Sequence, residues 1–140
     1  MNKRRLLRLA DLLDADAKNE AGVKFNLSGW GSSSTGAPAN VSCGTTACAM
    51  GLAVLSGAFE QDGLRNGFGP RSCSVIPYFQ TGQKVVSGFK AAANLFGISH
   101  KAAEWLFQDD HYRKSQWTGA AGERAVARRI RKFVAGEARP

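Results

Sequence analysis

The chain has 140 residues, of which 44% are hydrophobic and 21% are charged, a composition that is typical of a globular domain and excludes a disordered chain. No apolar stretch approaches the roughly 18 residues that a membrane-spanning helix requires. The 19 lysines and arginines outnumber the 11 acidic residues, so the formal net charge is +8. This positive charge favours an acidic partner such as nucleic acid, a nucleotide or an acidic protein. The length predicts a single domain over residues 1–140 and leaves the oligomeric state open.

The cysteines and the N-terminal residues indicate the cellular compartment in which the protein is found. The start of the chain is basic and then apolar, as in a signal peptide, but Asp11 and Asp14 interrupt the apolar part and no small-residue cleavage site follows. The three cysteines are odd in number and form no Cys-x-x-Cys pair, which favours free thiols in a reducing compartment. We therefore predict a cytoplasmic protein. Because the cysteines and the two histidines lack zinc-binding spacing, we expect no metal site, and we expect no cofactor.

The first third of the chain contains one clear helical pattern. Leucine and alanine side chains fall on one stripe over residues 3–17, which predicts an amphipathic helix. Alternating apolar residues over 23–27 predict a short strand. Residues 28–40 are rich in glycine and serine and are predicted to form a loop, in which Trp30 either anchors the loop to the core or lines a ligand site.

The stretch around which we expect the fold to be organised is the segment from Cys43 to Leu55. Its residues are small or aliphatic on nearly every side, which predicts a buried central helix. Gly51 would cost about 1 kcal/mol relative to alanine in a free helix. We therefore expect another backbone segment to approach this helix closely at Gly51.

The second half begins with turn signals and ends with helices. Residues 60–84 carry repeated Gly and Pro turn signals, so we expect an irregular loop with one short strand at 73–76. One hypothesis is that this loop covers the start of the central helix as a lid and brings Arg65 or Arg71 to it.

Three further helices are predicted towards the C-terminus. Periodicity predicts a helix over 85–96 that stops at Gly97 and a short helix over 100–107 capped by Ser99. A last helix over 121–135 has a basic outer face, formed by Arg124, Arg128, Arg129, Arg131 and Lys132. The predicted fold class is therefore mainly α: about five helices around a central apolar helix, with at most two short strands and a long irregular loop.

The predicted start of the central helix is the leading candidate site. Free backbone N–H groups, the positive end of the helix dipole and two threonine hydroxyls would gather there, which is suited to holding an anionic group. Aromatic residues from the preceding segments would lie beside it. The candidate ligand-binding residues are Phe25, Asn26, Trp30, Asn40, Gly44, Thr45, Thr46 and Arg71. Our leading hypothesis is a non-catalytic binding module that holds an anionic ligand or an acidic partner, such as a phage accessory or inhibitor protein.

The first alternative is a thiol hydrolase. The segment Asn40–Ala47 resembles the motif around the reactive cysteine of ubiquitin C-terminal hydrolases, and also the Cys-Gly start of papain-like bacteriocin-processing peptidases. This resemblance implies that Cys43 is a nucleophile whose own N–H contributes to the oxyanion hole, with His100 as its base. The chain departs from both families, because Ala37 stands where they have glutamine and no residue that could orient the base follows His100 or His111 at their usual spacing.

The second alternative is DNA binding through residues 88–108. The run from Ala92 to Leu106 resembles a helix-turn-helix, with small residues at Ala93 and Gly97. The polar residues of the second helix would face DNA bases, namely His100, Lys101, Glu104 and Gln108. Against this, Trp105, Leu106 and Phe107 make that helix more apolar than a helix that reads a groove should be.

A wider resemblance covers about 80 residues in three segments. The pattern F-N-x-x-x-W … C-G-T-x-A-C-x-x-G … L-x-G-I-S-x-x-x-A-x-x-L-F is similar to that of a group of small phage and bacterial proteins to which no activity is assigned. The resemblance implies a common fold in which Phe25, Trp30 and the start of the central helix lie together. It brings no catalytic histidine, and therefore favours a binding module over an enzyme.

Overall fold

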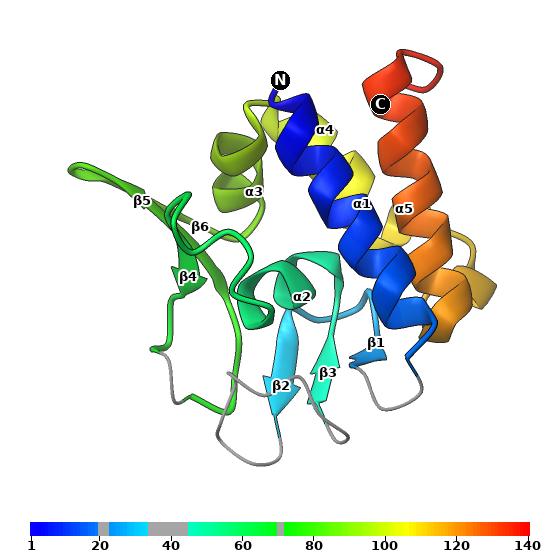
Figure 1. Cartoon of the computed structure of the whole chain (residues 1–140), viewed down its shortest axis with the longest axis horizontal. Coiled ribbons are helices and arrows are strands. Elements are labelled where there is room, and N and C mark those ends of the chain that lie inside the picture. Colours follow the sequence, from blue (N-terminus) through cyan, green and yellow to red (C-terminus); the bar gives the residue numbers. More distant parts are fainter. Residues whose placement is uncertain (20–22, 34–44, 70–71) are drawn as a thin grey trace.

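A computed structural model of the chain describes residues 1–19, 23–33, 45–69 and 72–140. These residues form five α-helices and six short strands, and the strands are arranged in two three-stranded sheets (Figure 1). The fold is therefore a mixture of α and β, and the prediction of a mainly α domain with at most two strands was wrong. None of the helices formed by the described residues is both long and apolar enough to cross a lipid bilayer.

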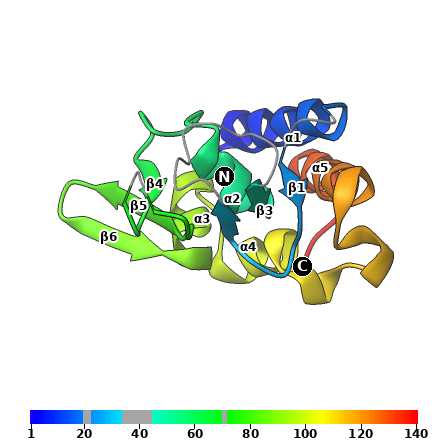
Figure 2. The ribbon, with the colours of Figure 1, turned by 90° about the horizontal axis from the view of Figure 1, so that it is seen from below.

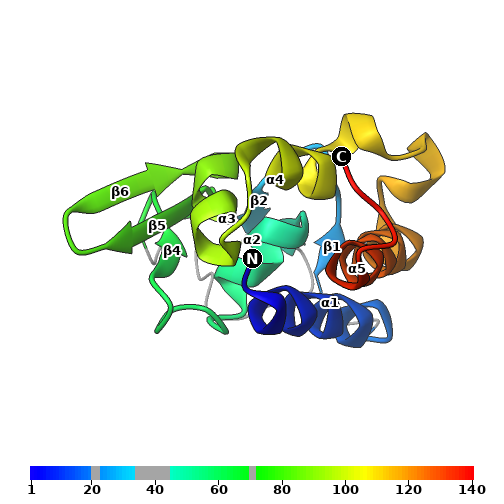
Figure 3. The same ribbon diagram turned by 90° about the horizontal axis from the view of Figure 1, so that it is seen from above.

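Two long helices from opposite ends of the chain lie side by side (Figures 1 and 3). Helix α1 spans Lys3–Ala17 and helix α5 spans Gly119–Ala135. Both amphipathic helices were predicted from their periodicity, and both are confirmed. Their buried faces contribute Leu6, Leu9, Ala10 and Leu13 from α1, and Val126, Ala127 and Ile130 from α5. The outer face of α5 is left to solvent.

The first sheet has the strand order β1-β3-β2. Its strands are β1 (Lys24–Phe25), β2 (Gly31–Ser33) and β3 (Thr45–Ala47), with β3 parallel to β1 and antiparallel to β2. The prediction that Thr45–Ala47 belongs to the central helix was therefore wrong. Two consecutive β-branched threonines favour an extended backbone once two neighbouring strands are present to pair with it.

Helix α2 follows β3 directly and spans only Ala49–Leu55. All of its residues except Val54 are buried, as the apolar pattern predicted. A Cβ atom added to Gly51 would lie 1.7 Å from the carbonyl oxygen of Trp30. The expected close approach of another backbone is thereby confirmed, and it comes from the residue that precedes β2.

The second sheet occupies the segment that was expected to be irregular. Its strands are β4 (Leu64–Asn66), β5 (Pro77–Thr81) and β6 (Lys84–Ser87), all antiparallel in the order β4-β5-β6. Instead of a strand at 73–76, the structure has an isolated bridge between Ser74 and Ser32. The β5–β6 hairpin turns at Gly82, which has a φ of 59°, and extends away from the helices (Figures 1 and 2).

A helical hairpin connects this sheet to the last part of the chain. Helix α3 spans Gly88–Phe96 and helix α4 spans His100–Phe107. Gly97 ends α3 with a φ of 61°, and the Ser99 hydroxyl accepts the Ala102 N–H at 3.1 Å, so both predicted helix signals are confirmed. The predicted cap, Ser87, is the N-cap residue of α3, but Val85, which was expected on the apolar face of this helix, lies in β6 and is 47% exposed.

The remaining elements complete the core. Two short 3-10 turns, η1 (Asp109–His111) and η2 (Lys114–Gln116), connect α4 to α5. Buried side chains from all five α-helices form one hydrophobic cluster, in which the largest fully buried residues are Phe59, Phe96 and Phe107. This cluster packs against the apolar side of α5, and the exposed charged residues of α5 lie on the opposite side.

Candidate functional site

A row of exposed cations runs along the outer face of α5. Arg124, Arg128 and Lys132 are spaced four residues apart, so successive side chains rise by about 6 Å and stay on one side of the helix. All three residues are exposed. Within the described part of the chain, none of them has a carboxylate oxygen within 4.0 Å of its charged nitrogen atoms. We call these three residues the α5 cation row.

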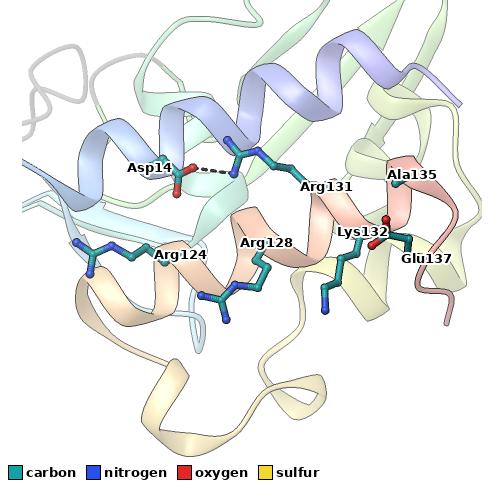
Figure 4. Close-up of a pocket in the computed structure, with 7 residues that line it drawn as sticks. All are labelled: Asp14, Arg124, Arg128, Arg131, Lys132, Ala135 and Glu137. Carbon is teal, nitrogen blue, oxygen red and sulfur yellow. Dashed lines mark ion pairs between the residues drawn. The ribbon is translucent and has the colours of Figure 1, made fainter.

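The neighbouring Arg131 is paired rather than free. Its guanidinium lies 2.8 Å from the Asp11 carboxylate and 2.7 Å from the Asp14 carboxylate, both on α1. Partial burial lowers the pKa of Arg131, but hydrogen bonds to these two carboxylates outweigh this effect and raise it. Figure 4 shows Arg131 reaching towards Asp14, while Arg128 and Lys132 point to the opposite side of α5. The positive charge of Arg131 is therefore compensated by carboxylates on the α1 side of the helix, whereas Arg128 and Lys132 point away from α1.

A shallow groove of about 450 Å³ accompanies the row (Figure 4). It is lined by Asp14, Arg124, Arg128, Arg131, Lys132, Ala135 and Glu137. Ala135 is the one apolar residue in this lining. The groove can therefore take a charged, hydrated group, and its lining contains no aromatic or large aliphatic side chain.

On the other side of the α5 cation row, the guanidinium of Arg129 packs against two aromatic rings. The guanidinium lies 3.7 Å from the centroid of the Tyr112 ring and 4.8 Å from that of the Trp105 ring. It also donates hydrogen bonds to the carbonyl oxygens of Trp105 and His111. Arg129 therefore ties α5 to α4 and η1 and is not available as a free charge. A hollow of about 190 Å³ beside this stack shares Arg128 and Lys132 with the groove.

Among the described residues that were predicted to hold an anion, several side chains are not open to a ligand. Thr45 is 1% exposed and Phe25 is 2% exposed, so both side chains are enclosed by the core. Asn26 uses its side-chain oxygen to accept hydrogen bonds from Ser28, and Thr46 is half-buried in β3. The predicted residues Asn40, Gly44 and Arg71 lie outside the described residues.

Trp30 is held at the junction of the first sheet and α3. Its ring meets the Phe89 ring edge-on at a centroid distance of 4.8 Å, and its carbonyl oxygen accepts the Cys48 N–H at 3.4 Å. A hollow of about 280 Å³ lies between Trp30, Phe89 and Phe107. Arg65, the other cation proposed for a lid, lies instead in β4 and pairs with Tyr78 of β5.

The cysteine at the start of α2 is Cys48, which is buried and caps this helix. Its sulfur accepts the Gly51 N–H at 3.4 Å, and burial raises the pKa of the Cys48 thiol to about 11. Cys43 lies outside the described residues, so its role as a nucleophile stays a prediction. His100, the proposed base, is exposed and its Nδ1 lies 3.6 Å from the Glu104 carboxylate.

The helix-turn-helix hypothesis receives a mixed result. Helices α3 and α4 do form a hairpin around Gly97, and Lys101 is exposed on the first turn of α4. The other proposed base-reading residues already contact the chain itself, because His100 faces Glu104 and the Gln108 amide donates to Asp110. The apolar side of α4 is used for packing, as its sequence indicated.

Comparison with known proteins adds no family. The chain matches no protein-family model, no curated protein and no solved structure. Among the described residues, no group of three His, Cys, Asp or Glu side chains is arranged to hold a metal ion. The assignment of function therefore depends on the geometry and charge of the chain's own surface.

Sequence reasoning identified the charges of α5 but not which of them are free. The spacing of Arg124, Arg128 and Lys132 is visible in the sequence and predicts that they share a face. The pairing of Arg131 with α1 and the stacking of Arg129 on two rings depend on contacts between distant segments. No local signal separates these two arginines from the α5 cation row.

Proposed function

We propose that this protein is a cytoplasmic binding module for an acidic partner, and that the α5 cation row contacts that partner. The observation that carries the proposal is the set of three exposed side chains, Arg124, Arg128 and Lys132, without carboxylate partners among the described residues. This location replaces the predicted site at the start of the central helix, where Thr45 is buried. The free thiols support the cytoplasmic assignment.

The arrangement of the row favours recognition by charge. An isolated exposed ion pair contributes only about 0.2–1 kcal/mol. Three cations on one helix face act on the same partner, and their summed field accelerates encounter with a negatively charged surface. Because α5 is packed against α1 and held to α4 by Arg129, the row needs little ordering when the partner binds.

The proposal is tested by comparing two variants with equal loss of charge. The row variant carries Arg124→Gln, Arg128→Gln and Lys132→Gln. The control variant carries Arg65→Gln, Lys84→Gln and Lys90→Gln, which are exposed residues of β4, β6 and α3. Both variants have a formal net charge of +5, since each removes three charges from +8.

Heparin-agarose chromatography gives the readout. We expect the row variant to elute at a clearly lower salt concentration than the wild-type protein, because the contact surface itself has lost its charge. The control variant should elute close to the wild type. Equal elution of the two variants would contradict the proposal, since it would mean that net charge alone governs binding. Circular dichroism confirms that both variants are folded.

A further inference from the structure

The surface around the α5 cation row is poor in apolar groups. The exposed positions of α5 are Gly119, Ala121, Arg124, Arg128, Lys132 and Ala135, and the groove beside them contains no aromatic or large aliphatic residue. The core of a protein–protein interface is depleted of charge and enriched in aromatic residues. Interfaces with nucleic acid are more polar and much more positive. The composition of this surface therefore favours nucleic acid over an acidic protein.

The spacing of the row fits a phosphate backbone. Two steps of about 6 Å place the first and last cations about 12 Å apart along the axis of α5. A strand of duplex DNA carries one phosphate per roughly 3.4 Å of rise, so the row extends over about three to four phosphates. Lysine and arginine contacts of this kind position a protein on the duplex without reading its sequence.

The rings near the row do not offer a platform for unpaired bases. The Trp105 ring has the Arg129 guanidinium over it and lies 6.1 Å from the Phe133 ring centroid. Tyr112 is buried, its hydroxyl donates to the Leu106 carbonyl oxygen, and Arg129 covers its ring. Proteins that bind single strands stack bases on exposed aromatic faces. Because Arg129 occupies one face of the half-buried Trp105 ring and covers the buried Tyr112 ring, these residues favour a duplex over a single strand.

The charges on either side of α5 fix where a duplex would lie. On the α1 side, the carboxylates of Asp11 and Asp14 would repel phosphates, although Arg131 offsets part of their charge. On the other side, the hollow that Arg128 and Lys132 also line contains Trp105, Tyr112, Gln116, Ala125, Arg129 and Ala138. The intervening residues Arg113 and Lys114 are both exposed and extend the positive surface in this direction.

We infer, on the basis of the proposed function, that the acidic partner is a nucleic-acid duplex whose phosphate backbone lies along the α5 cation row and towards η2, without base-specific contacts from α4. The shared chemistry is that of regularly spaced phosphodiesters, which both DNA and RNA duplexes supply. In this arrangement α5 is the contact helix, and α1 and α4 pack against it.

The test measures binding by fluorescence anisotropy over a range of salt concentrations. The labelled probes are two DNA duplexes of unrelated sequence, an RNA duplex, one of the DNA single strands and a poly-glutamate peptide. The wild type, the row variant and the control variant are compared. We expect the two DNA duplexes to bind with equal affinity, and to bind more tightly than the single strand or the peptide. The comparison between the DNA and RNA duplexes then identifies the source of the phosphates, because the natural duplex should bind more tightly. Loss of three phosphate contacts should reduce the slope of log K against log salt by about 2.7 in the row variant.

Different outcomes separate the inference from the proposed function. If poly-glutamate binds more tightly than the duplexes and its binding is lost in the row variant, the partner is an acidic protein; the inference fails while the proposed function stands. Tighter binding of the single strand, or a large difference between the two DNA duplexes, overturns the inference in the same way. If the row variant binds every probe as well as the control variant does, both the inference and the proposed function are wrong.

Discussion

Glu123 at the start of α5 provides a sharp test of the structural account. It is 3% exposed and interacts with Asp16 at the end of α1, whose carboxylate accepts the Val23 N–H at 3.3 Å. Burial, followed by the hydrogen bond and the negative charges of Asp16 and Asp14, raises the pKa of Glu123 from 4.5 to about 9, and Arg124 offsets part of this effect. We therefore predict that Glu123 is protonated at neutral pH, in which form its carboxyl can donate a hydrogen bond to Asp16.

This raised pKa sets the sign of a pH effect on stability. The folded state keeps the Glu123 proton up to about pH 9, whereas the unfolded chain loses it near pH 4.5. The stabilisation is complete below pH 4.5 and is lost as the pH rises towards 9. At about 1.4 kcal/mol per pKa unit, the full loss is at most about 6 kcal/mol. In Glu123→Gln the amide donates to Asp16 at every pH, so this variant should avoid the loss.

The assay is urea unfolding at several pH values between 5 and 8, and tryptophan fluorescence monitors the unfolding. We expect Glu123→Gln to be close to the wild type at pH 5 and more stable by several kcal/mol at pH 8. Glu137→Gln removes a carboxyl group from an exposed position just beyond α5 and should show no such trend. A constant difference in unfolding free energy between Glu123→Gln and the wild type across this range would refute the assignment of a protonated, buried Glu123.

Three further predictions concern packing, the thiols and a helix cap. Gly51→Ala should destabilise the protein by about 3 kcal/mol or more in urea unfolding, because its Cβ would collide with the Trp30 carbonyl oxygen; a smaller loss would mean that β2 and α2 separate easily. Iodoacetamide should modify the exposed Cys73 in the native protein but should leave Cys48 unmodified until the chain is unfolded, as peptide mass mapping would show. Ser99→Ala should cost about 1 kcal/mol through loss of the cap of α4, and unchanged stability would contradict that role.

The long helices could be predicted from the sequence, but most of the strands could not. Helices α1 and α5 have four or five turns, so their apolar stripes repeat often enough to be recognised. The strands have two to five residues, which is too short for alternation to be distinct. Strand β3 pairs with β1, about 20 residues earlier in the chain, and nothing local to Thr45 predicts that partner.

The sequence predicted only part of the candidate surface, again because contacts between distant segments decide the rest. Charge and spacing identified a basic face on the last helix, but its free and paired members differ only through contacts with remote segments. The ion pair between Asp11 and Arg131 joins residues 120 positions apart. Thr45 was expected at an open helix end, whereas it lies in β3 and its side chain is buried.

The most direct test of the central claim is a titration followed by NMR through the side-chain Nε–Hε signals of the arginines. Adding a short DNA duplex should shift the signals of Arg124 and Arg128, with a salt dependence that matches the binding measured by anisotropy. The signals of Arg131, which is held by α1, and of Arg65, which lies in the second sheet, should stay in place. Shifts at Arg65 without shifts at Arg124 and Arg128 would contradict the assignment of α5 as the contact surface.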